Sequence, residues 1–180
     1  MSKKVLIISS SMRKNSNSEA LAKEFEKGVK ETENEVEMIY LHDYEINFCK
    51  GCMACLKTKK CIIKDNTTEV MEKVRTADVL VFATPIYYYA VSGQLKTFLD
   101  RMNPIYSAGH NFKEVYLLTT AADEDDSAMD GAIKDLEGWI SCFDGVKLLG
   151  VVKGTNTDSI GDILKHTDKL QEAYNMGKNV

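Results

Sequence analysis

The sequence predicts an α/β fold in which a five-stranded parallel sheet carries helices on both faces. Three features of the 180 residues support this prediction. Short apolar runs recur along the chain, as expected of strands that are buried on both faces. Segments with apolar residues at helical spacing lie between these runs. The two kinds of segment alternate, which is typical of parallel strands joined by helical crossovers.

The expected strands are recognised by their apolar side chains. Residues 5–8 read VLII and residues 79–82 read VLVF, and neither run contains a polar side chain. Residues 36–40 mostly alternate between apolar and polar side chains, which also indicates a strand. In chain order, the five expected strands are residues 5–8, 36–40, 79–82, 115–118 and 146–152.

A helical segment follows each expected strand. Leu21, Phe25 and Val29 form one apolar stripe, and Leu95 and Phe98 belong to another. The expected helices are residues 18–31, 69–75, 91–102, 129–143 and 165–175. Five strands in this alternation fit a doubly wound, flavodoxin-like sheet with strand order 2-1-3-4-5, formed by a single domain over residues 1–180. Ligands of such sheets bind beyond the carboxyl ends of the strands, so the loops there are the expected site.

Composition and charge exclude several classes of protein. The net charge is −4 and the pI is about 5.5, whereas nucleic-acid binders usually carry a basic patch. No apolar run reaches the length of a membrane span. The N-terminal residues MSKKVLIISSS hold too few apolar side chains for a signal peptide. We therefore expect a cytoplasmic protein that binds neither nucleic acid nor membrane.

The loop after the first strand, residues 9–21, has the composition of a phosphate site. It holds five serines, two asparagines and Arg13, and it leads into a helix. Free backbone N–H groups and hydroxyls at a helix N-terminus bind anions, and an arginine adds a charge-assisted hydrogen bond. A serine or asparagine cap alone would explain one or two of these residues but not so many donors.

Two further loops follow expected strands. Residues 83–101 begin with a proline and three consecutive tyrosines, which offer a flat apolar surface beside a cofactor ring or at a subunit contact. Residues 119–132 begin with Thr119, Thr120 and Ala121, small residues that let the backbone approach a planar ligand closely. The acidic run that follows is expected to be solvated.

Four of the five cysteines lie within thirteen residues of the loop 48–65, with the spacing Cys49-x2-Cys52-x2-Cys55-x5-Cys61. In a reducing cytosol such a group is more often metal-binding or catalytic than disulfide-bonded. A C-x2-C-x2-C run can hold three corners of a [4Fe–4S] cluster, with a fourth thiolate from nearby. Structural zinc usually takes two pairs on distant segments. Two interpretations of the four cysteines remain: they bind a cluster, or they form a loop of free thiols.

Because the loop follows the second strand, we expect it at the same edge of the sheet as the other loops. Cys142 is expected to be buried.

The motifs SxSxRxxSNSxxL, CxxCxxCxxxxxC and TPIYYYxVSGQLKxFLDR together resemble the NADPH-dependent FMN reductase superfamily, and within it the iron–sulfur flavoprotein branch. The resemblance covers most of the chain to about residue 120 and is looser beyond it. It implies a flavodoxin-like fold, bound FMN, NAD(P)H as co-substrate, and a homodimer or homotetramer that completes the flavin site.

The resemblance also implies a set of site residues, by motif position. Those expected at the FMN phosphate are Ser11, Arg13, Asn17 and Ser18, and Ser9 and Ser16 are also expected to bind the cofactor. Those expected along the isoalloxazine are Met12, Pro85, Ile86, Tyr87 and Tyr88, with Thr119, Thr120 and Ala121 on its pyrimidine side. The implied ligands of a [4Fe–4S] cluster are Cys49, Cys52, Cys55 and Cys61. No side chain is assigned a catalytic role, since the flavin carries the chemistry.

The function predicted on these grounds is an FMN-dependent oxidoreductase that uses NAD(P)H to reduce flavin, a quinone or a similar acceptor. One alternative is an iron–sulfur flavoprotein that relays electrons between partner proteins. Another is a flavin-binding regulatory domain without turnover. Steady-state NAD(P)H oxidation separates the first from the other two. The expected partner is a small-molecule electron acceptor or a redox protein.

Overall fold

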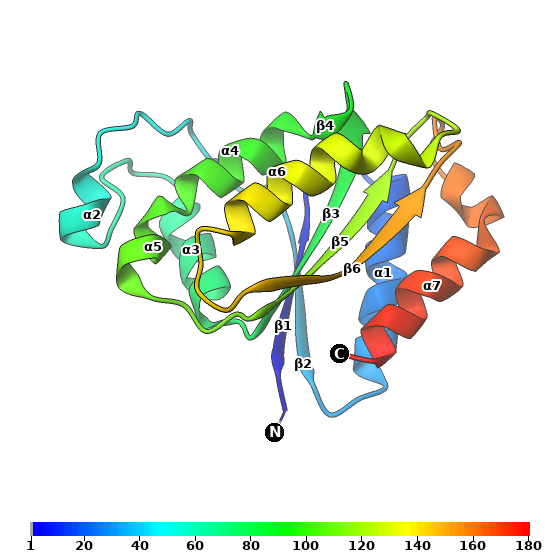
Figure 1. Cartoon of the computed structure of the whole chain (residues 1–180), viewed down its shortest axis with the longest axis horizontal. Coiled ribbons are helices and arrows are strands. Elements are labelled where there is room, and N and C mark those ends of the chain that lie inside the picture. The colour runs from blue at the N-terminus through cyan, green and yellow to red at the C-terminus, as the bar shows by residue number, and fades with distance from the viewer. Residues whose placement is uncertain (1) are drawn as a thin grey trace.

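Residues 2–180, which the computed structural model describes, form a six-stranded sheet with helices on both faces (Figure 1). The strands are β1 (Lys4–Ser9), β2 (Glu35–Tyr40), β3 (Val79–Tyr87), β4 (Ala90–Val91), β5 (Glu114–Thr120) and β6 (Lys147–Gly154). Five strands pair in parallel in the order β2-β1-β3-β5-β6. The predicted α/β class and the order of the five parallel strands are thus confirmed.

Two helices cover one face of the sheet and most of the others cover the opposite face (Figure 1). The α-helices are α1 (Asn17–Lys30), α2 (Ala54–Thr58), α3 (Thr67–Thr76), α4 (Gly93–Arg101), α5 (Asn103–Ala108), α6 (Asp130–Ile140) and α7 (Thr167–Lys178). Short 3-10 turns lie at η1 (Leu41–Asp43), η2 (Asp126–Met129) and η3 (Asp162–Lys165). Within residues 2–180, no helix is both long and apolar enough to cross a membrane.

The apolar core has two layers, one on each side of the sheet. Val5 and Ile7 of β1 belong to the layer under α1 and α7, which includes Phe25. Leu6 and Ile8 belong to the layer under α3, α4 and α6. Successive residues of a strand point to opposite faces, so a strand buried on both sides must be apolar at every position. This is why the central strands appear in the sequence as unbroken apolar runs.

The sixth strand, β4, was not predicted. β3 extends to Tyr87 rather than ending near residue 82, turns at Tyr88 and Tyr89, and returns as β4, with Ile86 opposite Val91. The expectation that a helix starts at Val91 was therefore wrong by two residues. The helix α4 begins at Gly93, because the Ser92 side chain caps it by accepting a hydrogen bond from the Leu95 N–H at 3.3 Å.

Two short helices and one cysteine also differ from expectation. Neither α2 nor α5 was predicted, since each spans fewer than two turns and shows no apolar stripe. Cys142 was expected to be buried but is exposed. The helix α6 ends at Ile140, so the apolar spacing that suggested burial does not continue to residue 142.

The crossing of α1 and α7 depends on two glycines. A Cβ on Gly28 would overlap the carbonyl oxygen of Tyr174, and one on Gly177 would overlap that of Phe25. We expect Gly28→Ala to lower the free energy of unfolding by about 1–3 kcal/mol, as overpacking does. Gly138→Ala on α6 is the control, because a Cβ there meets no atom within 4 Å among the described residues. Urea denaturation checks both variants, and equal stability of the two would contradict this account of the crossing.

Candidate functional site

Four loops meet at the carboxyl edge of the parallel strands and enclose a pocket of about 170 Å³. They adjoin the carboxyl ends of β1, β3, β5 and β6, and the last residues of β3 and β5 also line the pocket. The pocket is lined by Ser11, Arg13, Ser16, Asn17, Pro85, Ile86, Tyr87, Thr120, Ala122, Thr157, Asp158 and Ile160. Its position is the one at which doubly wound sheets bind ligands.

The loop after β1 presents the N-terminus of α1 to this pocket. Ser16 is the N-cap residue, and its hydroxyl accepts a hydrogen bond from the Glu19 N–H at 3.2 Å. Ser11 is buried, and its hydroxyl accepts one from the Arg13 N–H at 3.2 Å. A loop that bonds to its own backbone in this way is ordered before a ligand arrives. The helix N-terminus that it presents favours an anion.

The serines at the base of this loop are buried, and one of them lacks a partner. Ser9 is 1% exposed, and its hydroxyl makes no hydrogen bond within the described residues 2–180. Ser10 donates instead to the carbonyl of Ala83 at 3.2 Å and accepts from Ser92 at 3.0 Å. An unpartnered buried hydroxyl is uncommon, so it marks a position where a further polar group would be favourable.

The sequence suggested that Asn17 binds the phosphate, but in the structure its side chain bonds to the loop after β6. Its side-chain N–H₂ donates to the carbonyls of Thr157 at 3.1 Å and Ser159 at 2.9 Å. Its side-chain oxygen accepts from the N–H groups of Gly161 at 3.0 Å and Ile163 at 3.2 Å. The amide thus joins α1 to the loop after β6 and shapes the wall of the pocket.

Arg13 lies at the mouth of the pocket. It is exposed, and its guanidinium Nη1 reaches the carbonyl of Asp158 at 3.5 Å. A guanidinium held by a single weak hydrogen bond is free to turn toward an anion on the helix N-terminus. Among the lining residues it is the one with a full positive charge.

Pro85, Ile86 and Tyr87 form the apolar wall of the pocket, at the end of β3. The next two residues form a tight turn in which Tyr88 and Tyr89 both have a positive φ, at 50° and 63°. This conformation is strained for residues with a Cβ, and strain of this kind gathers at functional sites. Tyr88 is 100% exposed and lies outside the pocket, although the sequence suggested that it borders the ligand.

Only some of the remaining expected site residues line the pocket. Thr120 lines the pocket, whereas four others are buried and are not among its lining residues: Ser9, Ser18, Thr119 and Ala121. Met12 is exposed and lines a neighbouring pocket of about 340 Å³, together with Leu41, Tyr44, Ile46, Phe48, Gly93, Gln94 and Thr97. Four lining residues were missed in the sequence: Ala122, Thr157, Asp158 and Ile160. The polar run TNTDS after the last strand was the available signal for two of them, Thr157 and Asp158.

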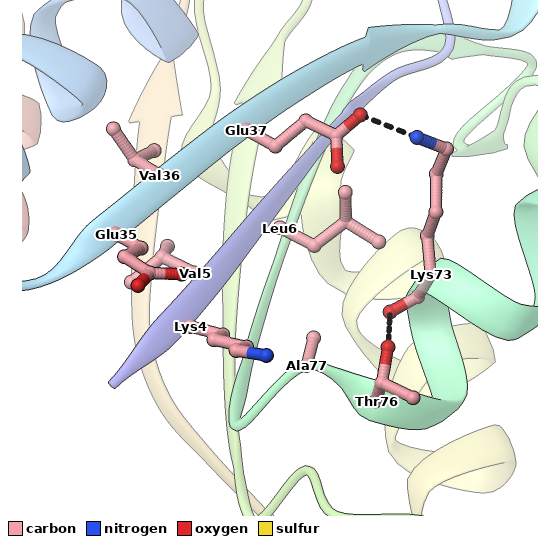
Figure 2. A pocket seen from close by; sticks show the side chains of 9 residues that line it. All are labelled: Lys4, Val5, Leu6, Glu35, Val36, Glu37, Lys73, Thr76 and Ala77. Atoms are coloured by element: carbon pink, nitrogen blue, oxygen red, sulfur yellow. Dashed lines mark hydrogen bonds and ion pairs between the residues drawn. The ribbon is translucent and has the colours of Figure 1, made fainter. Parts of the chain in front are cut away.

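A separate groove of about 300 Å³ lies at the other end of the sheet, beside β1, β2 and α3. Figure 2 shows that the Glu37 carboxylate and the Lys73 ammonium face each other across it, 2.6 Å apart. Its other lining residues are Lys4, Val5, Leu6, Glu35, Val36, Thr76 and Ala77. This groove contains none of the expected site residues and adjoins the amino ends of the strands, so it is not the candidate site.

The four cysteines of the loop 48–65 surround one small pocket of about 30 Å³. Cys49 and Cys52 are exposed, Cys55 is buried and Cys61 is half-buried. The pocket is closed by the junction of α4 and α5, which contributes Arg101, Asn103 and Pro104. Within the part of the chain that the structure describes, no three His, Cys, Asp or Glu side chains are placed to hold a metal ion.

The position of the cysteines corrects one expectation. The loop leaves the carboxyl end of β2 but runs along α4 to its far end, where α2 packs on α5 (Figure 1). The cysteine pocket and the pocket at the sheet edge share no lining residue. A nine-residue helix such as α4 is about 13 Å long. The thiols therefore do not emerge beside the other loops of the same chain.

A buried ion pair holds the cysteine loop in place. The side chains of Arg101 and Asp65 are both 0% exposed, and they meet through two parallel bonds of 2.6 and 3.1 Å. Asp65 also accepts from the N–H groups of Asn47 and Thr67, each at 3.0 Å. Burial alone would raise the pKa of Asp65, but these hydrogen bonds, led by the guanidinium, hold it well below its ordinary value of 3.8.

This shift gives the protein an acid-sensitive contribution to stability. Because the pKa of Asp65 is lower when folded than unfolded, its contribution is complete above the unfolded value, near 3.8, and is lost as the pH falls below it. Denaturation curves of wild type and Asp65→Asn should therefore differ most near neutral pH and converge below about pH 4. A difference that stays constant from pH 7 to pH 3 would contradict this role of the carboxylate.

Residues 3–152 match the family model described as NADPH-dependent FMN reductase. The chain belongs to the NADPH-dependent FMN reductase family. An iron–sulfur flavoprotein of Methanocaldococcus jannaschii is 38% identical over 102 residues, which cover 57% of this chain and 53% of that protein. One of Archaeoglobus fulgidus is 48% identical over 73 residues, or 41% of this chain and 36% of that protein. The matches thus span about half or less of these relatives.

The fold of the chain is similar to that of a solved structure. An NAD(P)H:quinone oxidoreductase of Methanothermobacter marburgensis superposes with a TM-score of 0.74 at 18% identity, covering 99% of this chain and 97% of that chain. This likeness shows the flavodoxin-like fold alone. The resemblance inferred from the motifs is confirmed by the family model and by the iron–sulfur flavoprotein relatives.

The pocket at the sheet edge fits the FMN that membership of the reductase family supports. The N-terminus of α1 and Arg13 are suited to a phosphate, and the wall of Pro85, Ile86 and Tyr87 is suited to a flat ring. The unpartnered Ser9 hydroxyl lies at the base of the same loop. The donor chemistry therefore agrees with a flavin mononucleotide.

The cysteine pocket of this reductase-family chain contains the thiols that a cluster needs as ligands, but their positions in this structure are not those of a metal site. Four thiols of one loop surround one pocket, which is the donor set that iron–sulfur clusters use. Among residues 2–180, however, the sulfurs do not converge into a metal site.

Proposed function

We propose that the protein is an FMN-dependent oxidoreductase that moves electrons from NAD(P)H to a small acceptor such as a flavin or a quinone. The observation that carries this proposal is the pocket at the carboxyl edge of the sheet, which a phosphate-type loop and the apolar residues at the end of β3 both line. Membership of the NADPH-dependent FMN reductase family supports it. We also infer that residues 1–180 act as one FMN-binding domain.

Each part of the pocket has a task in this function. Bound FMN supplies reversible hydride transfer, and the chain supplies binding and orientation. Ser11, Ser16 and Arg13 hold the phosphate, because their loop presents a helix N-terminus and a cation. Pro85, Ile86 and Tyr87 keep water from one side of the ring. The neighbouring apolar pocket beside Met12 offers room for an acceptor.

The test is steady-state turnover of FMN-reconstituted protein under anaerobic conditions. NADH and NADPH are each offered with free riboflavin or a benzoquinone as acceptor. Nicotinamide oxidation well above the rate with free FMN alone is the expected result. Protein that binds FMN tightly but gives no such excess with either nicotinamide would overturn the enzymatic proposal and favour a binding or relay role.

A second candidate function is an electron-transfer module that carries an iron–sulfur cluster. The observation that favours it is the set of four thiols around one pocket, in a chain whose relatives are named iron–sulfur flavoproteins. Cys49, Cys52, Cys55 and Cys61 are the ligands of that cluster. Anaerobic reconstitution followed by iron analysis and visible spectroscopy tests it, with about four irons per chain expected for a [4Fe–4S] centre. FMN-loaded protein that takes up no iron would leave only the first function.

We further propose that the protein forms a homo-oligomer whose interface lies beside the β3–β4 turn. Tyr88 and Tyr89 are 100% and 62% exposed at this turn. Exposed tyrosines in a strained, ordered turn are typical of interface anchors. Light scattering at micromolar concentration is expected to show a dimer or a tetramer, and Tyr88→Ser to shift the population toward monomer. Monomeric wild-type protein under these conditions would refute the proposal.

A further inference from the structure

We propose that Arg101 and Asn103 are positioning residues of the cysteine site, each donating an N–H hydrogen bond to one metal-binding sulfur. The inference rests on the second function proposed above, that the four thiols bind a metal cluster. It concerns two residues that lie 40 or more positions away from the thiols they contact. The sequence motif of the cysteines does not include them.

Asn103 contacts the most buried thiol. Its side-chain N–H₂ donates to the Cys55 sulfur at 2.9 Å, a short distance for a hydrogen bond to sulfur. The side chain does not cap α5, because the N-cap residue of that helix is Met102. The backbone at Cys55 is anchored separately, since the Ser107 hydroxyl donates to its carbonyl at 3.2 Å. The amide of Asn103 is therefore directed at the sulfur and is not needed to attach the loop.

Arg101 contacts a second thiol. Its Nη2 donates to the Cys61 sulfur at 3.4 Å, while Nη1 donates to the Asn47 carbonyl at 2.6 Å. The Asp65 carboxylate accepts one bond from each of these two nitrogens, which balances the charge of the guanidinium and fixes the orientation of its plane. A buried ion pair is seldom more stabilising than a well-packed apolar pair. Two well-packed apolar side chains in place of Arg101 and Asp65 would hold this corner as well, but they would offer no N–H to the sulfur.

The donors divide the four cysteines into two halves. Cys55 and Cys61 receive hydrogen bonds from the α4–α5 junction. Cys49 and Cys52 are exposed, and the described residues place one contact on this pair, from the Gly51 N–H to the Cys49 sulfur at 3.5 Å. One half of the site is thus held in place before metal binds, and the other half closes over it. Groups that orient metal ligands in this way act on both affinity and electronic structure.

The experiment uses Co²⁺ alone as a probe of the thiol site in metal-free, FMN-loaded protein. Thiolate-to-cobalt charge-transfer bands in the near ultraviolet report both occupancy and the electron density on sulfur. Asn103→Leu keeps the size of the side chain but removes the donor. We expect it to weaken Co²⁺ binding by about 10- to 100-fold, as loss of a ligand-orienting group does. We also expect the remaining bands to shift to lower energy, because the sulfur loses its hydrogen bond.

Two further variants separate positioning from simple packing. Asn103→Gln retains an N–H₂ group and is expected to restore most of the affinity and the band position. Asn111→Leu is the matched control, since this asparagine donates to the Thr76 carbonyl away from the cysteines. Arg101→Lys keeps the positive charge but not the planar fork, and it is expected to shift the bands in the same direction as Asn103→Leu.

The outcomes distinguish this inference from the functions on which it rests. Bands that are unchanged in both Asn103→Leu and Arg101→Lys overturn the inference alone. Wild-type protein without thiolate bands overturns the cluster proposal, and the inference with it. FMN content, measured in the same samples, is expected to be equal in all variants, because the two pockets share no residue. Equal FMN content also shows that each variant is folded.

Discussion

Replacing Arg13 by alanine is expected to weaken FMN binding by about 10- to 150-fold, because a charge-assisted hydrogen bond contributes roughly 1.5–3 kcal/mol. Arg13 is the cation at the mouth of the pocket, and within residues 2–180 its guanidinium makes one hydrogen bond, a long one of 3.5 Å to the Asp158 carbonyl. Little protein structure is lost with the side chain, so the effect should fall on the phosphate. Quenching of flavin fluorescence on binding measures the dissociation constant.

The neighbouring lysine provides the control for this prediction. Lys14 is also exposed and carries the same charge, but it does not line the pocket. Lys14→Ala should change FMN affinity less than about threefold, through long-range attraction alone, which roughly 0.15 M salt largely screens. If both variants lose affinity equally, the effect is one of net charge and Arg13 does not contact the phosphate.

Asn17 shows how far the sequence could predict this site. Its place in a polar loop before a helix suggested a phosphate ligand, and the structure does put it in the lining of the pocket. Its amide, however, makes four hydrogen bonds to residues 157–163, some 140 positions later. The composition of a loop shows which hydrogen-bond donors it contains. It does not show which of those donors will be bonded to a segment far away in the sequence.

The central strands could be predicted from local sequence, whereas the path of the cysteine loop could not. The central strands were predictable because burial on both faces requires apolar residues at every position, a local property. The path of residues 48–65 was not, because Arg101 at the end of α4 holds it through bonds to the Asn47 carbonyl and to Asp65, and nothing in the local sequence of Arg101 marks that role. The tight turn at Tyr88 was missed for a related reason. Two tyrosines with positive φ contradict the usual turn chemistry.

Arg101→Met is expected to lower the free energy of unfolding by about 3–5 kcal/mol, the cost of breaking a buried ion pair from one side. The arginine and Asp65 side chains are both 0% exposed, so the carboxylate that remains cannot be hydrated. It would keep the N–H groups of Asn47 and Thr67 but lose both guanidinium bonds. Urea denaturation followed by circular dichroism measures the change. Lys96→Met is the control, because its 2.7 Å contact with Asp100 is exposed and should contribute less than about 1 kcal/mol.

The double variant Arg101→Met with Asp65→Asn tests the cause of this loss. If the cost comes from an unpaired buried charge, removing that charge should recover part of the stability, even though a second polar group has been altered. The amide oxygen that replaces the carboxylate can still accept one of the two backbone N–H bonds, so we expect the double variant to be more stable than Arg101→Met alone. If it is less stable, the guanidinium acts mainly through its bonds to Asn47 and Cys61 rather than by compensating Asp65. The cysteine loop, not the charge pair, would then be what Arg101 stabilises.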